Sequence, residues 1–216
     1  MSKRSYHQFC PLAYSLDQVG ERWTLLLVRE LLFGPRRYTD LLNGLPGIGT
    51  NLLAKRLKDM EQAGIIRQRL LPPPAGSTVY ELTDRGRELE EAMAALARWG
   101  ARYVQLPAPE DDYMGTIPTM AAFVMLFDAR IAEDVSITCE VHADHDVFHV
   151  TVREGRLDIQ PGAAVRPDVV IAGEPKAILN RIVTGPVADG GKFTVESGSV
   201  ETFARFASAF HFPNGG

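Results

Sequence analysis

Residues 50–63 have the sequence TNLLAKRLKDMEQA, and this stretch predicts the fold of the N-terminal half of the chain. At 100° per residue, Leu53, Leu57 and Met60 share one face of a helix, which we expect to be buried. The opposite face carries Asn51, Lys55, Lys58 and Gln62. An α-helix fits the DNA major groove, where Asn and Gln can bind adenine edges and Lys can bind guanine or phosphate. The helix is therefore predicted to contact DNA, and an ordinary solvated face is the alternative.

The elements around this helix extend the pattern. Helices are expected over Trp23–Phe33 and Tyr38–Asn43, and strands over Ile65–Leu71 and Thr78–Leu82. This is the element order of a winged helix-turn-helix. The wing tip, Pro74–Thr78, carries no Lys or Arg, so strand residues must supply the backbone contacts. The further predicted DNA contacts are Arg36, Arg37, Arg56, Arg67 and Arg69. Arg56 lies on the flank of the helix, where it can reach phosphate or pair internally.

A longer helix is predicted to follow the wing. Thr83 or Asp84 caps it, and its apolar stripe extends over about five turns. The stripe consists of Leu89, Met93, Leu96, Trp99 and Tyr103. A helix of this length needs a partner surface, so we expect a subunit interface of a homodimer. Packing of the stripe onto its own domain is the alternative.

Charge and length indicate two domains. With 216 residues, 45% of them hydrophobic, the chain has material for one or two cores. Residues 1–107 hold 15 Lys and Arg against 11 Asp and Glu, and residues 108–216 hold 8 against 16, which gives +4 and −8. Only the first half is therefore expected to bind a polyanion. The proline-rich acidic stretch Leu106–Asp112 predicts a boundary, with domains at 1–106 and 110–212.

Several motifs in series resemble the HxlR family of winged helix-turn-helix regulators, of the MarR-like superfamily. They are Cys10-Pro11, Gly20–Leu31, Gly34–Tyr38, Leu45–Ile48, Leu53–Leu57, Leu82–Gly86 and Trp99. The resemblance covers residues 10–103 and implies a homodimer whose two recognition helices lie roughly 34 Å apart, one turn of duplex DNA. Family members often begin the recognition helix with Ser-Pro-Arg-like residues. Here it begins Gly49-Thr50-Asn51, so one basic contact is missing.

The C-terminal half is predicted to be an α+β domain. Helices are expected over Ile117–Ala132, Glu174–Val183 and Val200–Phe210, with strands between them. Its segments Asp168–Pro175 and Phe193–Gly198 resemble the sterol carrier protein type 2 fold. That resemblance implies a sheet covered by helices, with an apolar cavity. The candidate cavity residues are Met120, Phe123, Met125, Phe127, Phe203, Phe206 and Phe210. A filled core and a protein-interaction surface are the alternatives.

Signals for catalysis and metal binding are weak. Cys139, His142 and His145 have metal-like spacing, but alternation along a strand turns Cys139 and His142 to opposite faces, so we expect no metal site. No nucleotide loop or catalytic set is recognisable, and we expect neither an enzyme nor a cofactor. Cys10 is a redox candidate because Lys3, Arg4 and His7 can lower its pKa. A buried inert thiol is the alternative.

The predicted function is a sequence-specific DNA-binding transcriptional regulator that responds to an apolar small molecule. Its predicted partners are operator DNA and a second copy of the chain. Without a signal peptide, a long apolar run or a disulfide framework, it is expected in the cytoplasm, away from membranes. The alternatives are a thiol-based redox regulator acting through Cys10, and an apolar-ligand carrier whose winged helix only dimerises.

Overall fold

The computed structural model describes residues 5–73, 76–104, 109, 111–185 and 191–211. The chain divides into two compact units, residues 1–93 and 94–216, and each unit is described by itself. Two predicted features, the boundary Leu106–Asp112 and the wing tip around Pro74 and Ala75, lie largely outside the described residues.

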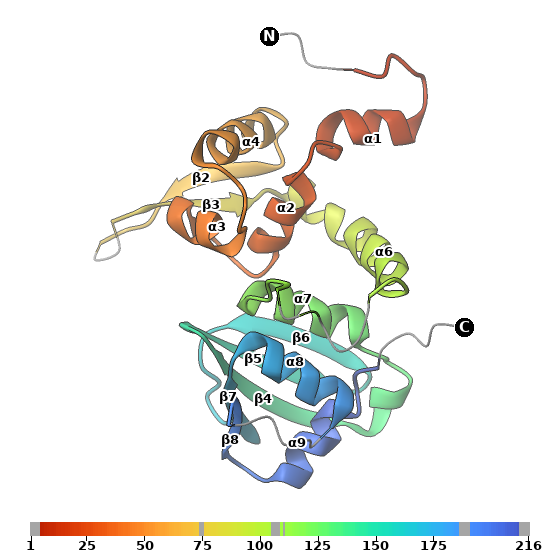
Figure 1. The fold of residues 1–216 in the computed structure, drawn as a ribbon, viewed down its shortest axis with the longest axis vertical. Coiled ribbons are helices and arrows are strands. Elements are labelled where there is room, and N and C mark those ends of the chain that lie inside the picture. The colour runs from red at the N-terminus through yellow and green to blue at the C-terminus, as the bar shows by residue number, and fades with distance from the viewer. Residues whose placement is uncertain (1–4, 74–75, 105–108, 110, 186–190, 212–216) are drawn as a thin grey trace. The chain divides into compact units, whose positions relative to one another are not determined.

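The first unit contains helices and a small sheet (Figure 1). Its helices are α1 (Pro11–Val19), α2 (Thr24–Leu32), α3 (Tyr38–Gly44), α4 (Thr50–Gln62) and α5 (Asp84–Arg87), and α6 (Leu89–Ala101) begins in it. Its strands are β1 (Arg36–Arg37), β2 (Ile66–Leu70) and β3 (Thr78–Leu82). The strands form an antiparallel sheet in the order β1-β3-β2. This confirms the predicted helix-turn-helix with a two-stranded wing to within one residue at each end.

The core of the first unit is built from the predicted apolar faces. Leu53, Leu57 and Met60 of α4 are buried, and they pack with Leu27 and Leu31 of α2. The helix ends where the backbone of Gly64 takes a positive φ of 69°, a conformation that glycine adopts without steric cost. The orientation predicted for α4, with its apolar stripe inward, is therefore confirmed.

The long helix predicted after the wing is interrupted. It divides at Glu88 into α5 and α6, and α6 ends at Ala101, before Tyr103. The first turn is tied to the wing, because the Thr83 amide donates to Ile65 O at 3.0 Å and its hydroxyl to Gly64 O at 2.6 Å. The backbone of Gly86 lies against Ile65 O, with no room for a side chain. These contacts hold α5 on the hairpin. The single helix predicted after the wing is two helices, α5 and α6, so that prediction was wrong.

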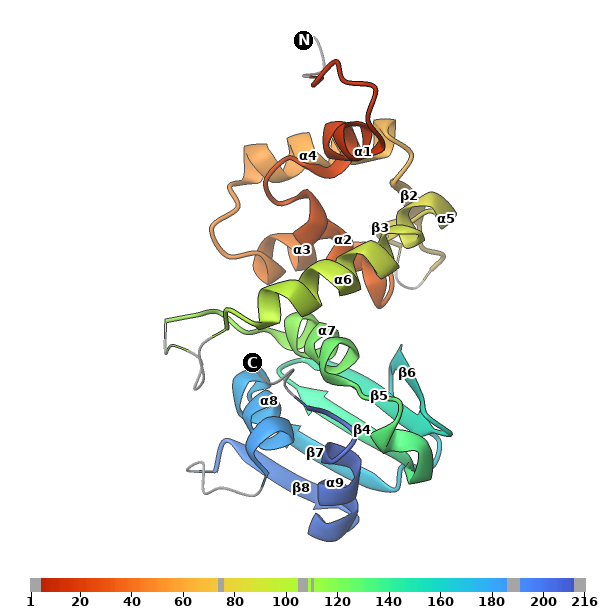
Figure 2. The ribbon, with the colours of Figure 1, turned by 90° about the vertical axis from the view of Figure 1, so that its right-hand side faces the viewer.

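The second unit is an α+β layer (Figure 2). Its strands are β4 (Ser136–Ala143), β5 (Asp146–Arg153), β6 (Arg156–Pro161), β7 (Val169–Gly173) and β8 (Phe193–Ser197). They form one sheet in the order β6-β5-β4-β7-β8, in which only the β4–β7 pair is parallel. Helices α7 (Thr116–Leu126), α8 (Pro175–Thr184) and α9 (Val200–Ala207) pack on the sheet, and η1 (Ile131–Asp134) is a short 3-10 helix. The predicted α+β class is confirmed.

Two helices of this unit are shorter than predicted, and one contact explains both. We expected helices to Ala132 and to Phe210, whereas α7 ends at Leu126 and α9 at Ala207. Phe127 and Phe210 form an isolated antiparallel bridge, and His211 N donates to Leu126 O at 2.7 Å. The backbone groups that would have continued each helix are used to join the two chain segments.

Candidate DNA-binding site

The face of α4 opposite its buried stripe is exposed. It carries the four polar side chains that were predicted to lie on this face, Asn51, Lys55, Lys58 and Gln62. Lys55 Nζ lies 3.2 Å from Asp59 Oδ2, one turn further along the helix. The carboxylate of Asp59 thus offsets part of the positive charge of Lys55. The side chains stand where DNA contacts were predicted, and their roles remain predictions.

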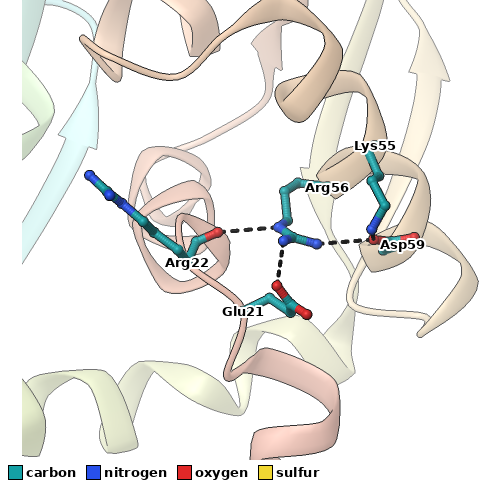
Figure 3. A network of polar contacts seen from close by, with 5 residues as sticks. All are labelled: Glu21, Arg22, Lys55, Arg56 and Asp59. Carbon is teal, nitrogen blue, oxygen red and sulfur yellow. Dashed lines mark hydrogen bonds and ion pairs between the residues drawn. The ribbon is translucent and has the colours of Figure 1, made fainter. Parts of the chain in front are cut away.

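Arg56 differs from the other basic residues of the helix. Its side chain is only 8% exposed and lies between α4 and the turn that joins α1 to α2 (Figure 3). It donates to Glu21 Oε2 at 2.5 Å, to Asp59 Oδ2 at 3.2 Å and to Arg22 O at 3.2 Å. Of the two alternatives left open by the sequence, internal pairing is the one observed. The role that was predicted for Arg56 as a DNA contact is not tested by this pairing.

The arginines next to α3 occupy the edge strand β1. Arg36 is half-buried and Arg37 is exposed. The Arg37 amide donates to Asp40 Oδ2 at 2.9 Å, so that Asp40 caps the first turn of α3. Both side chains remain candidates for contact with the DNA backbone.

The wing contains a charged residue that the sequence analysis missed. Glu81 of β3 lies directly opposite Arg67 in the hairpin register, and Arg69 points to the same face two residues further on. Arg67 Nε donates to Glu81 Oε1 at 2.8 Å and Arg69 Nε donates to Glu81 Oε2 at 2.9 Å. The hydrogen bond from Arg67, together with that from Arg69, holds the pKa of the Glu81 carboxyl below its ordinary value. Aligning the two predicted strands of the hairpin places Glu81 opposite Arg67, so this ion pair could have been predicted from the sequence.

Replacing Glu81 by glutamine is expected to strengthen binding to any DNA duplex. The substitution removes the charge that offsets Arg67 and Arg69, so the salt dependence of binding should steepen by up to about 2 in the slope of log K against log salt. Binding titrations at several salt concentrations measure this. Glu90→Gln, with the same change in charge on α6, is the control, and an unchanged slope in Glu81→Gln would exclude the wing arginines as phosphate contacts.

The same variant should alter acid stability. Because the folded-state pKa of Glu81 is lowered, its ion pairs stabilise the fold above the ordinary pKa of 4.5, and this contribution is lost as the pH falls through the lower folded value. Glu81→Gln should lack this part of the pH dependence, and chemical unfolding at pH 7 and at pH 4 measures the difference.

The predicted dimer stripe divides into two parts along α6. Leu89 and Met93 are half-buried and pack against the core of the first unit. Leu96 and Trp99 are 51% and 58% exposed, and Tyr103, beyond the end of the helix, is also exposed. The alternative of packing on the chain's own core thus applies to the first two residues. The last three remain candidates for a subunit interface.

An exposed apolar set near the N-terminus was not predicted. It consists of Tyr6, Phe9, Leu12, Tyr14 and Leu16. Leu12 and Leu16 are four residues apart and share one side of α1. Their helical spacing is visible in the sequence, but spacing alone does not show whether a chain buries such a face itself.

Four of the predicted cavity residues of the second unit have rings that pack together, namely Phe123, Phe127, Phe206 and Phe210. Met120, Phe123, Phe203, Phe206 and Phe210 are buried, and Phe127 is half-buried. The rings of Phe206 and Phe210 have centroids 5.1 Å apart, and those of Phe123 and Phe210 are 5.2 Å apart. A pocket of about 360 Å³ lies elsewhere, lined by Ser136, Ile137, Asp168, Glu201, Thr202 and Arg205. None of the predicted cavity residues lines that pocket.

The Cys139–His145 segment has the alternation expected of a strand. Cys139 is buried, and burial raises the pKa of its thiol. His142 lies on the other face, with Nε2 2.6 Å from Glu140 Oε1 and Nδ1 3.4 Å from Glu196 Oε2. Within the described part of the chain, no group of three or more His, Cys, Asp or Glu side chains could hold a metal ion.

Cys10 is a free, half-buried cysteine immediately before α1. Of the three basic residues predicted to act on it, Lys3 and Arg4 lie outside the described residues, and His7 is exposed. A redox role for Cys10 remains a prediction.

Comparison with known proteins agrees with this geometry. Residues 18–107 match the HxlR-like helix-turn-helix family. An uncharacterized HTH-type transcriptional regulator of Synechocystis sp. is 35% identical over 96 residues, which are 44% of this chain and 71% of that protein. The HTH-type transcriptional regulator YodB of Bacillus subtilis is 31% identical over 97 residues, 44% of this chain and 87% of YodB. The chain belongs to the HxlR-like helix-turn-helix family. It is therefore a transcriptional regulator with a helix-turn-helix DNA-binding domain.

A solved structure of YodB in its reduced form is also similar to this HxlR-like chain. It is 29% identical and covers 45% of this chain and 97% of its own, with a TM-score of 0.40. The family match ends at residue 107, so most of the second unit lies outside it. Among the described residues of this regulator, no helix is both long and apolar enough to cross a membrane.

Proposed function

We propose that this HxlR-like regulator binds operator DNA sequence-specifically as a homodimer, with α4 as the recognition helix. The observation that carries the proposal is the exposed face of α4, where Asn51, Lys55 and Lys58 stand opposite a fully buried apolar stripe. Amide side chains can discriminate adenine edges in the major groove, and the lysines can bind guanine or phosphate. Two recognition helices related by a dimer axis would contact successive major grooves on one side of the duplex.

Salt-dependent binding to the promoter region beside the chain's own gene tests this proposal, and it also separates a DNA-binding regulator from a ligand carrier. Lys58→Ala should weaken binding to all sequences and lower the salt slope by about 1. Lys55→Ala should have a smaller effect, because Asp59 already offsets the charge of Lys55.

Lys192→Ala is a matched control for these variants. Lys192 makes an exposed ion pair with Glu174, also at 3.2 Å, in the second unit. Its loss changes the net charge equally without touching α4. Unchanged DNA affinity in both Lys55→Ala and Lys58→Ala would contradict the assignment of the recognition helix.

We further propose that the second unit binds an apolar small molecule that changes DNA affinity. Two features support this proposal. Residues 168–175 and 193–198 resemble the sterol carrier protein type 2 fold in sequence, and several phenylalanine rings pack together in this unit. Apolar aromatic walls are typical of small-molecule sites. A coupling of about 1–3 kcal/mol would change DNA affinity by roughly 5–150-fold, and DNA would change ligand affinity by the same factor.

A further inference from the structure

One side chain joins the recognition helix to the turn that precedes α2. The guanidinium group of Arg56 has acceptors on both sides of this contact: Asp59 on α4 itself, and the carboxylate of Glu21 and the carbonyl of Arg22 in the turn. Figure 3 shows the group lying between these partners. Arg56 is 8% exposed at its side chain, whereas Glu21 is 52% exposed. The buried element of the network is therefore the arginine, and its acceptors reach it from two separate segments.

The turn that Arg56 contacts has an unusual backbone. Trp23 has a φ of 78°, a left-handed conformation that is unfavourable for a residue with a side chain. The guanidinium of Arg22 lies 5.1 Å from the centroid of the Trp23 ring. A side chain at Gly47, in the loop before α4, would come within 3.7 Å of the same ring. The turn thus approaches α4 through Arg56 and the preceding loop through Trp23.

The direction of these bonds constrains α4 in a way that its apolar stripe does not. Apolar contacts are non-directional, so burial of Leu53, Leu57 and Met60 fixes which side of the helix faces inward but only loosely fixes its rotation about its own axis. A guanidinium group presents its donors in a rigid planar fork. Arg56 and Asp59 lie on one flank of the helix, so bonds from this flank to Glu21 and Arg22 oppose rotation.

We infer that Arg56 is a positioning residue for DNA recognition: it fixes the rotation of α4 without touching DNA. The inference rests on the proposed function of α4. Contacts to base edges require accurate side-chain geometry, whereas contacts to phosphate give affinity without sequence information. Loss of Arg56 therefore lowers the preference for the operator and leaves general affinity for DNA in place.

The test compares two duplexes of equal length. One is the sequence that the unaltered protein selects from a random library, and the other is an unrelated sequence. Arg56→Gln should weaken binding to the selected duplex about tenfold or more, the effect expected of one lost base-edge contact. Binding to the unrelated duplex should stay within about twofold, with an unchanged salt slope, because no phosphate contact is removed.

Two further variants separate positioning from a general loss of charge or structure. Glu21→Gln, altered at the exposed end of the network, should lower the operator preference in the same direction, although removal of a negative charge would by itself strengthen DNA binding. Arg85→Gln is the charge-matched control, since Arg85 Nη1 donates to Ala63 O at the end of the same helix. Arg85→Gln should retain the operator preference. Melting temperatures of all three variants identify any that fail to fold.

Opposite results overturn the inference. Equal weakening of Arg56→Gln on both duplexes, with a salt slope lower by about 1, would make Arg56 a phosphate contact. An undiminished operator preference in both Arg56→Gln and Glu21→Gln would exclude a positioning role. If the unaltered protein shows no salt-dependent binding to any duplex, the proposed function itself is wrong, and the inference falls with it.

Discussion

Replacing both Leu96 and Trp99 by glutamate is expected to yield a monomer whose affinity for operator DNA is lower by a factor of roughly 100 or more. Both side chains are large, apolar and more than half exposed on the chain alone, which is typical of residues that another surface covers. Two carboxylates in a dry interface lack partners and oppose association. Because a dimer holds its second recognition helix at high effective concentration beside the DNA, loss of the dimer removes this gain, which commonly amounts to about 10²–10⁴.

Light scattering at micromolar concentration measures the mass, and DNA titration measures the loss of affinity. Arg98→Glu is the control, because Arg98 is exposed and lies on the opposite side of α6 from Leu96. It should leave the dimer intact. If the unaltered protein is a monomer, the proposed homodimer is wrong. If the protein with both glutamates is still a dimer, the interface lies elsewhere, and the exposed face of α1 is the next surface to alter.

Local patterns predict the elements of the first unit well, because its core follows from apolar spacing. The stripe of Leu53, Leu57 and Met60 is enough to predict which face of α4 is buried. The internal pairing of Arg56 could not be predicted in this way, since its partners Glu21 and Arg22 are more than 30 residues away along the chain. Spacing places a side chain on the flank of a helix but does not show which distant segment folds against that flank.

The errors have a similar origin. Residues 127–132 continue a helical pattern, but α7 ends at Leu126, where Phe127 forms a bridge with Phe210. The backbone of Gly86, in α5, lies against Ile65 O, a contact between elements that helical periodicity cannot predict. In both places a tertiary contact outweighs local helix propensity.

Truncation of Phe206 to alanine is expected to lower the free energy of unfolding of the second unit by about 3–5 kcal/mol. Phe206 is fully buried, and its ring lies 5.1 Å from that of Phe210 and 6.3 Å from that of Phe123. The loss combines the transfer of the ring from an apolar interior with the cavity left behind. Chemical unfolding, monitored with a spectroscopic probe in the second unit, measures this loss of stability. Val124→Ala, on the exposed side of α7, is the control and should change the free energy of unfolding little.

The same variant decides between a ligand cavity and a filled core. If the rings line a native cavity, a fluorescent fatty-acyl or aromatic probe should bind the unaltered chain saturably and raise its melting temperature, as any ligand of the folded state does. An engineered apolar cavity of ring size can also bind a small aromatic molecule. A probe that stabilises only Phe206→Ala would therefore show that the native interior is filled by its own side chains. That result would contradict the proposal of an apolar effector at these rings and would leave the second unit as a structural or partner-binding module.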